Sequence, residues 1–316
     1  MALELESYPA SKRSNLEIFE DLHQGTNWFT IEHDGWHLPA TDEPKEDCGK
    51  WLFKGCLNVL AHKKSDYPGK IFLKTFQKSC YRADCSKCYR KWISRQSNKA
   101  TRRMKVYEKK SKEPVKHIVV SPPPWEYGKS KQELAKEAYK ILKKVKAKGG
   151  AIIFHPNRYD KNLNRWYYSP HFHVVGFGWI EHTEEIFKEN GWVVKNLGVR
   201  DSVFSTFYYQ LSHAGIKKGY HTLVWFGDLS YSKLKIEKEP DSNVCPLCSA
   251  KLRPLYHHGL FGYVPPPETE VELFVEPEGW YYLESKLFEK IQTTKEDKHE
   301  YMLHRDLYYA NKGVNL

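Results

Sequence analysis

Two histidines one residue apart lie in an apolar stretch of the sequence, and their spacing suits metal binding. The stretch SPHFHVVGFG, residues 169–178, contains His171 and His173. Side chains alternate along a β-strand, so both imidazoles point to one face while Phe172 and Val174 point to the other. Imidazole nitrogens are common ligands of divalent metals. With 15 histidines in the chain, one such pair is expected by chance, so two structural strand histidines are the alternative interpretation.

A third histidine is predicted to join this pair. Residues 151–157, AIIFHPN, and residues 168–180 both read as strands, and consecutive strands usually pair. A hairpin between them places His155 opposite His171 or within one residue pair of it. Three imidazoles from two adjacent strands, with further coordination positions left open, are typical of a catalytic metal site. Alternatively, His155 only ends its strand before Pro156.

Most of the seven cysteines are closely spaced, which predicts one or two structural zinc sites. The first cluster is C-x4-C-x2-C, formed by Cys80, Cys85 and Cys88, and the second is C-x2-C, formed by Cys245 and Cys248. A tight turn brings two such thiolates to one side, where they can bind the same tetrahedral ion. Candidates for the missing ligands are Cys56 or Cys48, with His62 behind them, at the first cluster, and His257 and His258, or Cys48, at the second.

The composition favours a polyanionic partner. The 316 residues include 50 Lys and Arg against 39 Asp and Glu, a formal charge of +11, so nucleic acid is the first candidate and an anionic membrane the second. The 10 Trp, 21 Tyr and 15 Phe suit stacking on unpaired bases. No apolar run of eighteen residues or signal-peptide pattern occurs, so we expect a cytoplasmic protein with no membrane partner. The predicted DNA-binding side chains are Arg158, Arg165, Arg90, Lys91 and Arg95.

The elements that must position these residues alternate in type. Their order, β-α-β-β-(α)-β-α-β, predicts an α+β fold with an antiparallel sheet covered by helices, with a ferredoxin-like (RRM-like) or split βαβ core. The helix after the Ser130 cap has apolar residues at helical spacing and stops at Gly149 and Gly150. The remaining predicted elements are a strand over 115–123, a short helix HTEEIFKEN, a short strand GWVVKN, a helix over 201–216 and a strand over 220–229.

The helix over 201–216 offers a nucleophile. Its apolar stripe consists of Phe204, Phe207, Tyr208 and Leu211. Tyr209 is turned about 100° from that stripe and lies four residues before His213, close enough for contact. The alternative is that both tyrosines only pack, which suits Tyr208 better than Tyr209.

These features together resemble a known family. The His171–Phe172–His173 motif, the preceding strand VKHIVVSPP and the following tyrosine-bearing helix resemble the HUH endonucleases, which include rolling-circle replication initiator (Rep) proteins, relaxases and single-strand transposases. The resemblance covers roughly residues 114–230, and the flanking cysteines are similar to those of zinc-bearing Rep proteins of archaeal plasmids and viruses. It implies an HUH-type antiparallel sheet flanked by zinc-binding segments, with Tyr209 or Tyr208 as the nucleophile. Many Rep proteins have a lysine three residues after that tyrosine, whereas this sequence has Leu211 and Ser212 at those positions and His213 one residue further on.

The resemblance also implies an activity. His171, His173 and His155 would hold Mg²⁺ or Mn²⁺ against a phosphate of single-stranded or hairpin origin DNA, and a tyrosine would form a 5′-phosphotyrosine link that is later rejoined. Rolling-circle replication would follow, with a host helicase or polymerase as a further partner, since no G-x-x-x-x-G-K-[ST] motif occurs. Alternatives are a transposase or relaxase of the same superfamily and a non-enzymatic, zinc-stabilised DNA- or RNA-binding protein.

The same reasoning divides the chain into four consecutive segments. Residues 1–47 carry no interpretable motif, and residues 48–113 form a zinc-binding region with a basic helix. Residues 114–232 form the endonuclease core, and residues 233–316 contain the second zinc knuckle followed by a charged helical tail.

Overall fold

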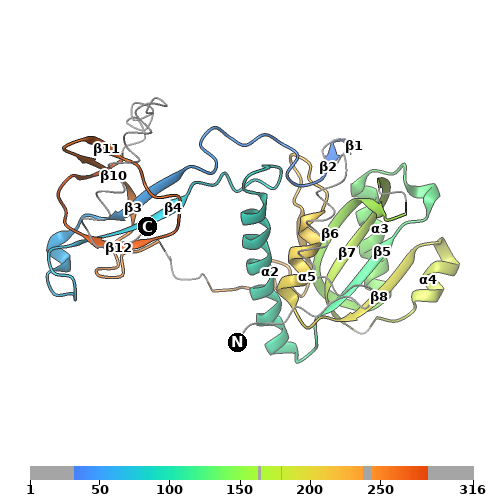
Figure 1. The fold of residues 1–316 in the computed structure, drawn as a ribbon. Coiled ribbons are helices and arrows are strands. Elements are labelled where there is room, and N and C mark those ends of the chain that lie inside the picture. Colours follow the sequence, from blue (N-terminus) through green and yellow to red (C-terminus); the bar gives the residue numbers. More distant parts are fainter. Residues whose placement is uncertain (1–31, 163–164, 179, 238–242, 284–316) are drawn as a thin grey trace. The chain divides into compact units, whose positions relative to one another are not determined.

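A computed structural model of the chain describes residues 32–162, 165–178, 180–237 and 243–283 (Figure 1). The predicted charged tail and most of the N-terminal segment 1–47 lie outside these ranges. The chain forms two compact units, each made of two separate segments. Within the described ranges, unit 1 comprises residues 32–45 and 80–237, and unit 2 comprises residues 46–79 and 243–283.

The secondary structure of the two units is mixed. Unit 1 contains β1 (Glu32–His33), β2 (Trp36–His37), α2 (Tyr89–Ser111), β5 (Lys116–Ser121), η3 (Pro124–Glu126), α3 (Lys131–Lys144), β6 (Ala147–Asp160), β7 (Arg165–Gly178), α4 (Thr183–Asn190), β8 (Val193–Val199), α5 (Val203–Ser212) and β9 (Leu223–Gly227). Unit 2 contains β3 (Trp51–Cys56), η2 (Val59–His62), β4 (Ile71–Gln77), β10 (Arg253–Gly259), β11 (Gly262–Val264), β12 (Glu272–Val275) and β13 (Trp280–Tyr282).

Unit 1 is built on an antiparallel five-stranded sheet in the order β8-β5-β7-β6-β9. Its elements follow the predicted order, so the α+β class is confirmed. The stretch expected to be an open loop between β6 and β7 instead extends both strands, and Tyr159 pairs with Trp166. Burial alternates there as in a strand, because Trp166 is buried between the exposed Arg165 and Tyr167.

Helices cover both faces of this sheet (Figure 1). The predicted cap of α3 is confirmed, because the Ser130 hydroxyl accepts from the Glu133 backbone and the Glu133 carboxylate accepts in return. The predicted stop is wrong, because α3 ends at Lys144 and Gly149 and Gly150 lie within β6. One core lies between the sheet and α3 with α4, and it contains Ile118, Phe172 and Val174. The other lies between the sheet, α5 and α2.

The second core fixes the face on which the paired histidines lie. It contains Ile153 and Val175 from the sheet together with Phe207 and Leu211 from α5. Because side chains alternate along a strand, His155, His171 and His173 share a face with Ile153 and Val175 and therefore lie on the α5 side. The helix predicted over 201–216 is shorter in the structure, since α5 ends at Ser212.

Unit 2 has a separate sheet in the order β11-β10-β3-β4-β12, with β13 also paired to β10. Its small core includes Phe53, Leu73, Leu255 and Trp280. The predicted segments 48–113 and 233–316 are therefore not independent, because β3 pairs with β10 and β4 with β12. Such pairing of distant strands leaves no trace in local periodicity. None of the helices in the described ranges combines the length and apolar character needed to cross a membrane.

Candidate functional site

The three predicted histidines lie side by side on two neighbouring strands. In the hairpin register, His155 of β6 is directly opposite His171 of β7, and His173 follows on the same face. One ring nitrogen from each can be chosen so that all three lie within 4.8 Å of one another. The pairing of β6 with β7 therefore positions the predicted group.

The ring orientations suit a shared cation. The Nε2 atoms of His171 and His173 are 3.2 Å apart, and the ring of His155 lies 4.4 Å, centre to centre, from that of His173. Within the described part of the chain, neither ring nitrogen of buried His155 has a hydrogen-bond partner. A buried polar atom without a partner is costly, and a metal ion would satisfy it. The residues present thus fit a divalent ion.

The Nδ1 atoms of His171 and His173, on the opposite side of each ring from Nε2, have contacts of their own. The Nδ1 of His171 lies 2.8 Å from the carbonyl oxygen of Ser169, and the Nδ1 of His173 lies 2.7 Å from the Nε2 of His117. A carbonyl oxygen only accepts, so the Nδ1 of His171 carries the proton and its Nε2 is left for a ligand. The Nδ1 of His173 can donate to His117 in the same way, which would leave its Nε2 for a ligand. His117, on β5, was not singled out from the sequence. The alternation of the predicted strand 115–123 could have placed it on this face once β5 was paired with β7.

Burial keeps these imidazoles neutral. It lowers the pKa of His171 to about 3, with the nearby positive charge of Arg158 contributing, and it lowers the pKa of His117 to about 3. Burial likewise holds the pKa values of His155 and His173 well below the ordinary value of 6.5. Neutral imidazoles are the form that binds metals, so the group can bind a cation at neutral pH.

Helix α5 connects the histidines to a tyrosine. The ring of His213, at the end of α5, lies 4.5 Å from the ring of His155 and 4.7 Å from that of Tyr209. Tyr208 instead packs against the second core, with its ring 5.8 Å from Phe204. The expected difference between the two tyrosines therefore matches their contacts.

The predicted DNA-binding side chains lie in two places. Arg158 donates from Nε to the Ser169 hydroxyl at 3.2 Å and from Nη2 to the Ser121 hydroxyl at 2.8 Å. Arg165 is exposed at the start of β7. The remaining three, Arg90, Lys91 and Arg95, are exposed on the first two turns of α2. Only Arg158 lies beside the histidine group.

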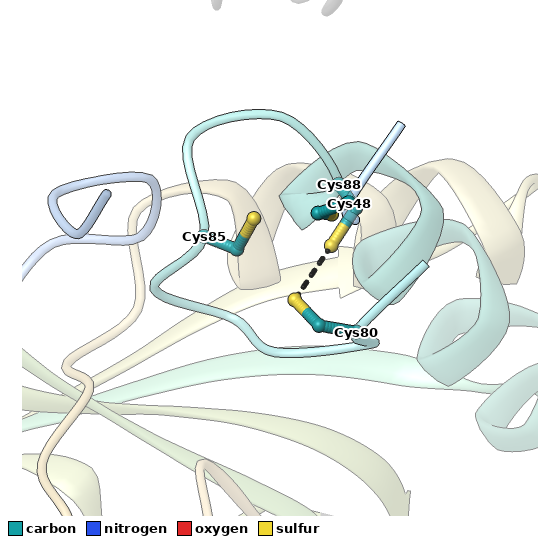
Figure 2. A group of neighbouring side chains, drawn as sticks. All are labelled: Cys48, Cys80, Cys85 and Cys88. Atoms are coloured by element: carbon teal, nitrogen blue, oxygen red, sulfur yellow. Dashed lines mark hydrogen bonds between the residues drawn. The ribbon is translucent and has the colours of Figure 1, made fainter. Parts of the chain in front are cut away.

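Four cysteines form the first candidate zinc site. Cys80, Cys85 and Cys88 are joined by Cys48, one of the two predicted fourth ligands, and all four sulfurs lie within 4.8 Å of one another (Figure 2). Burial raises the pKa of the Cys85 thiol to about 12. Zinc binding would ionise such thiols and release their protons, so the group could hold a zinc ion.

The second candidate zinc site, in unit 2, consists of Cys56, His62, Cys245 and Cys248. The Nε2 of buried His62 lies 3.3 Å from the sulfur of Cys248 and 3.4 Å from that of Cys245, while its Nδ1 lies 2.8 Å from the carbonyl oxygen of Lys70. The sulfurs of Cys56 and Cys248 are 3.6 Å apart. This set, with its outer contact on the histidine, is typical of a structural zinc site.

The structure corrects the expected ligands of this second site. Cys56 and His62, considered for the first cluster, join Cys245 and Cys248, whereas His257 and His258 do not. Arg253, at the start of β10, pairs with Gly55, so the knuckle before β10 lies beside Cys56. His257 lies four residues further along β10, about 13 Å away at the rise of a strand. There it is buried against Trp280, and His258 is exposed.

Comparison with known proteins does not assign the chain to a family. No protein-family model, no curated protein and no solved structure matches the chain.

Proposed function

We propose that unit 1 is a metal-dependent endonuclease that cuts single-stranded DNA by attack of Tyr209 and stays covalently attached to the 5′ phosphate. The observation that carries the proposal is the chain of contacts from the His155, His171 and His173 group through His213 to Tyr209. This combination of three neutral imidazoles and a hydroxyl on a covering helix has the features of the HUH endonucleases that the sequence resembles.

The residues divide the chemistry between them. A divalent ion held by the three imidazoles would neutralise charge that builds on the phosphate oxygens. The Tyr209 oxygen attacks phosphorus, the bond to the 3′ oxygen breaks, and a 5′-phosphotyrosine forms. His213, in contact with the Tyr209 ring, is placed to accept the phenolic proton, and the departing 3′ oxygen takes up a proton in turn.

Tyr209 rather than Tyr208 is the proposed nucleophile. Tyr208 packs with the apolar residues of α5 and the second core, so its ring contributes to stability. Tyr209 contacts a histidine that itself contacts the metal-binding group. Rejoining by reversal of the same step conserves the bond energy, which suits initiation and termination of rolling-circle replication.

The metal is proposed to be Mn²⁺ or another divalent transition-metal ion. Mg²⁺ prefers oxygen ligands, whereas imidazole suits transition metals. Mn²⁺, Mg²⁺, Co²⁺ and Zn²⁺ should therefore be compared in the cleavage assay, and we expect Mn²⁺ to support more product than Mg²⁺.

The decisive experiment detects the covalent adduct. The full chain is incubated with a 5′- and 3′-labelled library of random single-stranded DNA and Mn²⁺, and the products are separated on denaturing gels. We expect a protein–DNA band with the wild type and with Tyr208→Phe, and none with Tyr209→Phe or His171→Ala. Phe keeps the ring and removes only the hydroxyl, so the two tyrosine variants are matched controls for packing.

The outcomes separate the alternatives. An adduct that persists in Tyr209→Phe and is lost in Tyr208→Phe would reverse the choice of nucleophile. Tight DNA binding without adduct in any metal would favour a non-enzymatic, zinc-stabilised nucleic-acid-binding protein. Sequencing the DNA attached to the wild type would reveal any preferred cutting site.

A further inference from the structure

Unit 1 contains a cleft of about 980 Å³ whose lining includes Arg158. It is lined by the end of β5, the proline turn that contains η3, the end of α4 and the start of β8. Its apolar walls include Trp125, Phe187 and Val193, which are 76 %, 58 % and 46 % exposed. Exposed apolar side chains that gather in one cleft, rather than singly, are typical of a binding site.

The tryptophan ring packs closely against the backbone of a neighbouring turn. Gly191 ends α4 with a φ of +74°, and a Cβ at that position would come within 2.7 Å of the Trp125 ring. The ring therefore rests on the Gly191 backbone, and only glycine allows so close an approach. The η3 turn that carries Trp125 makes a second contact, because buried Trp192 donates from Nε1 to the Glu126 carboxylate at 3.2 Å. An exposed aromatic face that packs on the backbone behind it can bind a flat ring with less side-chain entropy to lose than a freely rotating one.

The charged groups of the cleft favour an anion. Both lining carboxylates are already paired, Glu126 with Lys129 at 3.1 Å and Glu189 with Lys144. Arg158 is held by two serine hydroxyls and, in the described part of the chain, by no carboxylate. Ser169, which accepts from Arg158, is the residue whose carbonyl contacts His171. The unpaired guanidinium therefore lies between the aromatic cleft and the histidine group.

We propose that this cleft binds unpaired nucleobases of the DNA strand beside the phosphate that is cut, with one base stacked on Trp125 and an adjacent phosphate bound by Arg158. This inference rests on the proposed function for the identity of the strand. Single strands expose the faces of their bases, and stacking on aromatic side chains combined with basic groups is how proteins bind them without sequence preference. Duplex bases are already stacked on each other and would not enter.

The test measures binding, so that it does not depend on cleavage. Fluorescence anisotropy of a labelled single-stranded 30-mer of mixed sequence is followed with the full chain in fixed salt. We expect Trp125→Ala to weaken binding by about 5- to 150-fold, the range for loss of one stacked base. Trp125→Phe should recover most of the affinity. Phe261→Ala removes another exposed aromatic residue, in unit 2, and should leave the affinity unchanged.

A second probe separates stacking from phosphate binding. On an abasic strand of the same length, Trp125→Ala and the wild type should bind equally, while Arg158→Gln should weaken binding to both strands. Unchanged affinity of Trp125→Ala for the normal strand would overturn the proposal. So would the result that Trp125→Ala abolishes self-association of the chain without affecting DNA binding, since the cleft would then join two copies. If no adduct forms but the expected loss of affinity is seen, the endonuclease proposal fails while this one stands.

Discussion

Replacing His117 by alanine should weaken metal binding although His117 is not a member of the three-histidine group. Its Nε2 lies 2.7 Å from the Nδ1 of His173, and its side chain is only 1 % exposed. If His173 binds the metal through Nε2, its Nδ1 carries the proton and donates it to His117. Without that acceptor the His173 ring can rotate or change tautomer, and the ligand is no longer preorganised.

The expected loss follows from what such outer contacts contribute. Removing the group that orients a metal-binding histidine typically costs 10- to 100-fold in metal affinity, or about 1.4 to 2.7 kcal/mol. His117→Ala should therefore raise the dissociation constant for Mn²⁺ by that factor. Covalent adduct formation should return at saturating Mn²⁺. His117→Gln keeps an acceptor oxygen and should recover part of the affinity.

The assay is calorimetric titration of Mn²⁺ into protein freed of divalent ions at the histidine group, with circular dichroism to confirm folding. Val119→Ala is the matched control, because Val119 is buried on the same face of β5 and pairs with His173 in the register. It loses packing beside His173 but no hydrogen bond to the His173 ring. Equal Mn²⁺ affinity of His117→Ala and the wild type would refute the reasoning. Equal weakening by the two variants would assign the effect to packing.

Two further predictions concern metal content and pH. Mass spectrometry of the purified chain should find two zinc ions, and Cys85→Ser and Cys245→Ser should each remove one. A wild type without zinc, or a single variant that loses both ions, would contradict two separate structural sites. The metal-free protein should lose stability as the pH falls from about 6.5 towards 3. His171 and His117, with pKa values of about 3, stay neutral in the folded state, whereas in the unfolded chain they take up protons below about pH 6.5. Each histidine therefore lowers the free energy of unfolding by up to about 1.4 kcal/mol for each pH unit in this range. Urea unfolding at pH 7 and pH 5 measures the change, and equal free energies of unfolding would disprove it.

Local patterns in the sequence were sufficient for much of unit 1. Alternation predicted that His171 and His173 share a face, and the neighbouring strands predicted the pairing of His155 with His171, which the register confirms. The Ser130 cap and the apolar positions of α3 were also predicted and are confirmed. These features depend on contacts between residues close in the chain, whose geometry is set by strand and helix periods.

The partners that come from distant segments could not be predicted. His117 reaches His173 only because β5 pairs with β7, and His62 joins Cys245 only because η2 and the knuckle meet within unit 2. Arg158 was predicted to bind DNA, but its place between the histidine group and the Trp125 cleft depends on hydrogen bonds to Ser121 and Ser169.

The sequence by itself determined which residues could bind metals, how they alternate along their strands and in what order the elements of unit 1 follow. The tertiary structure decided which cysteines share a site, that the chain divides into two discontinuous units, and which side chains complete the histidine group. The reason is physical. Periodicity records which face of an element is buried, but many strands have equivalent faces, and only the pairing that buries the most apolar surface while satisfying the backbone hydrogen bonds selects their neighbours.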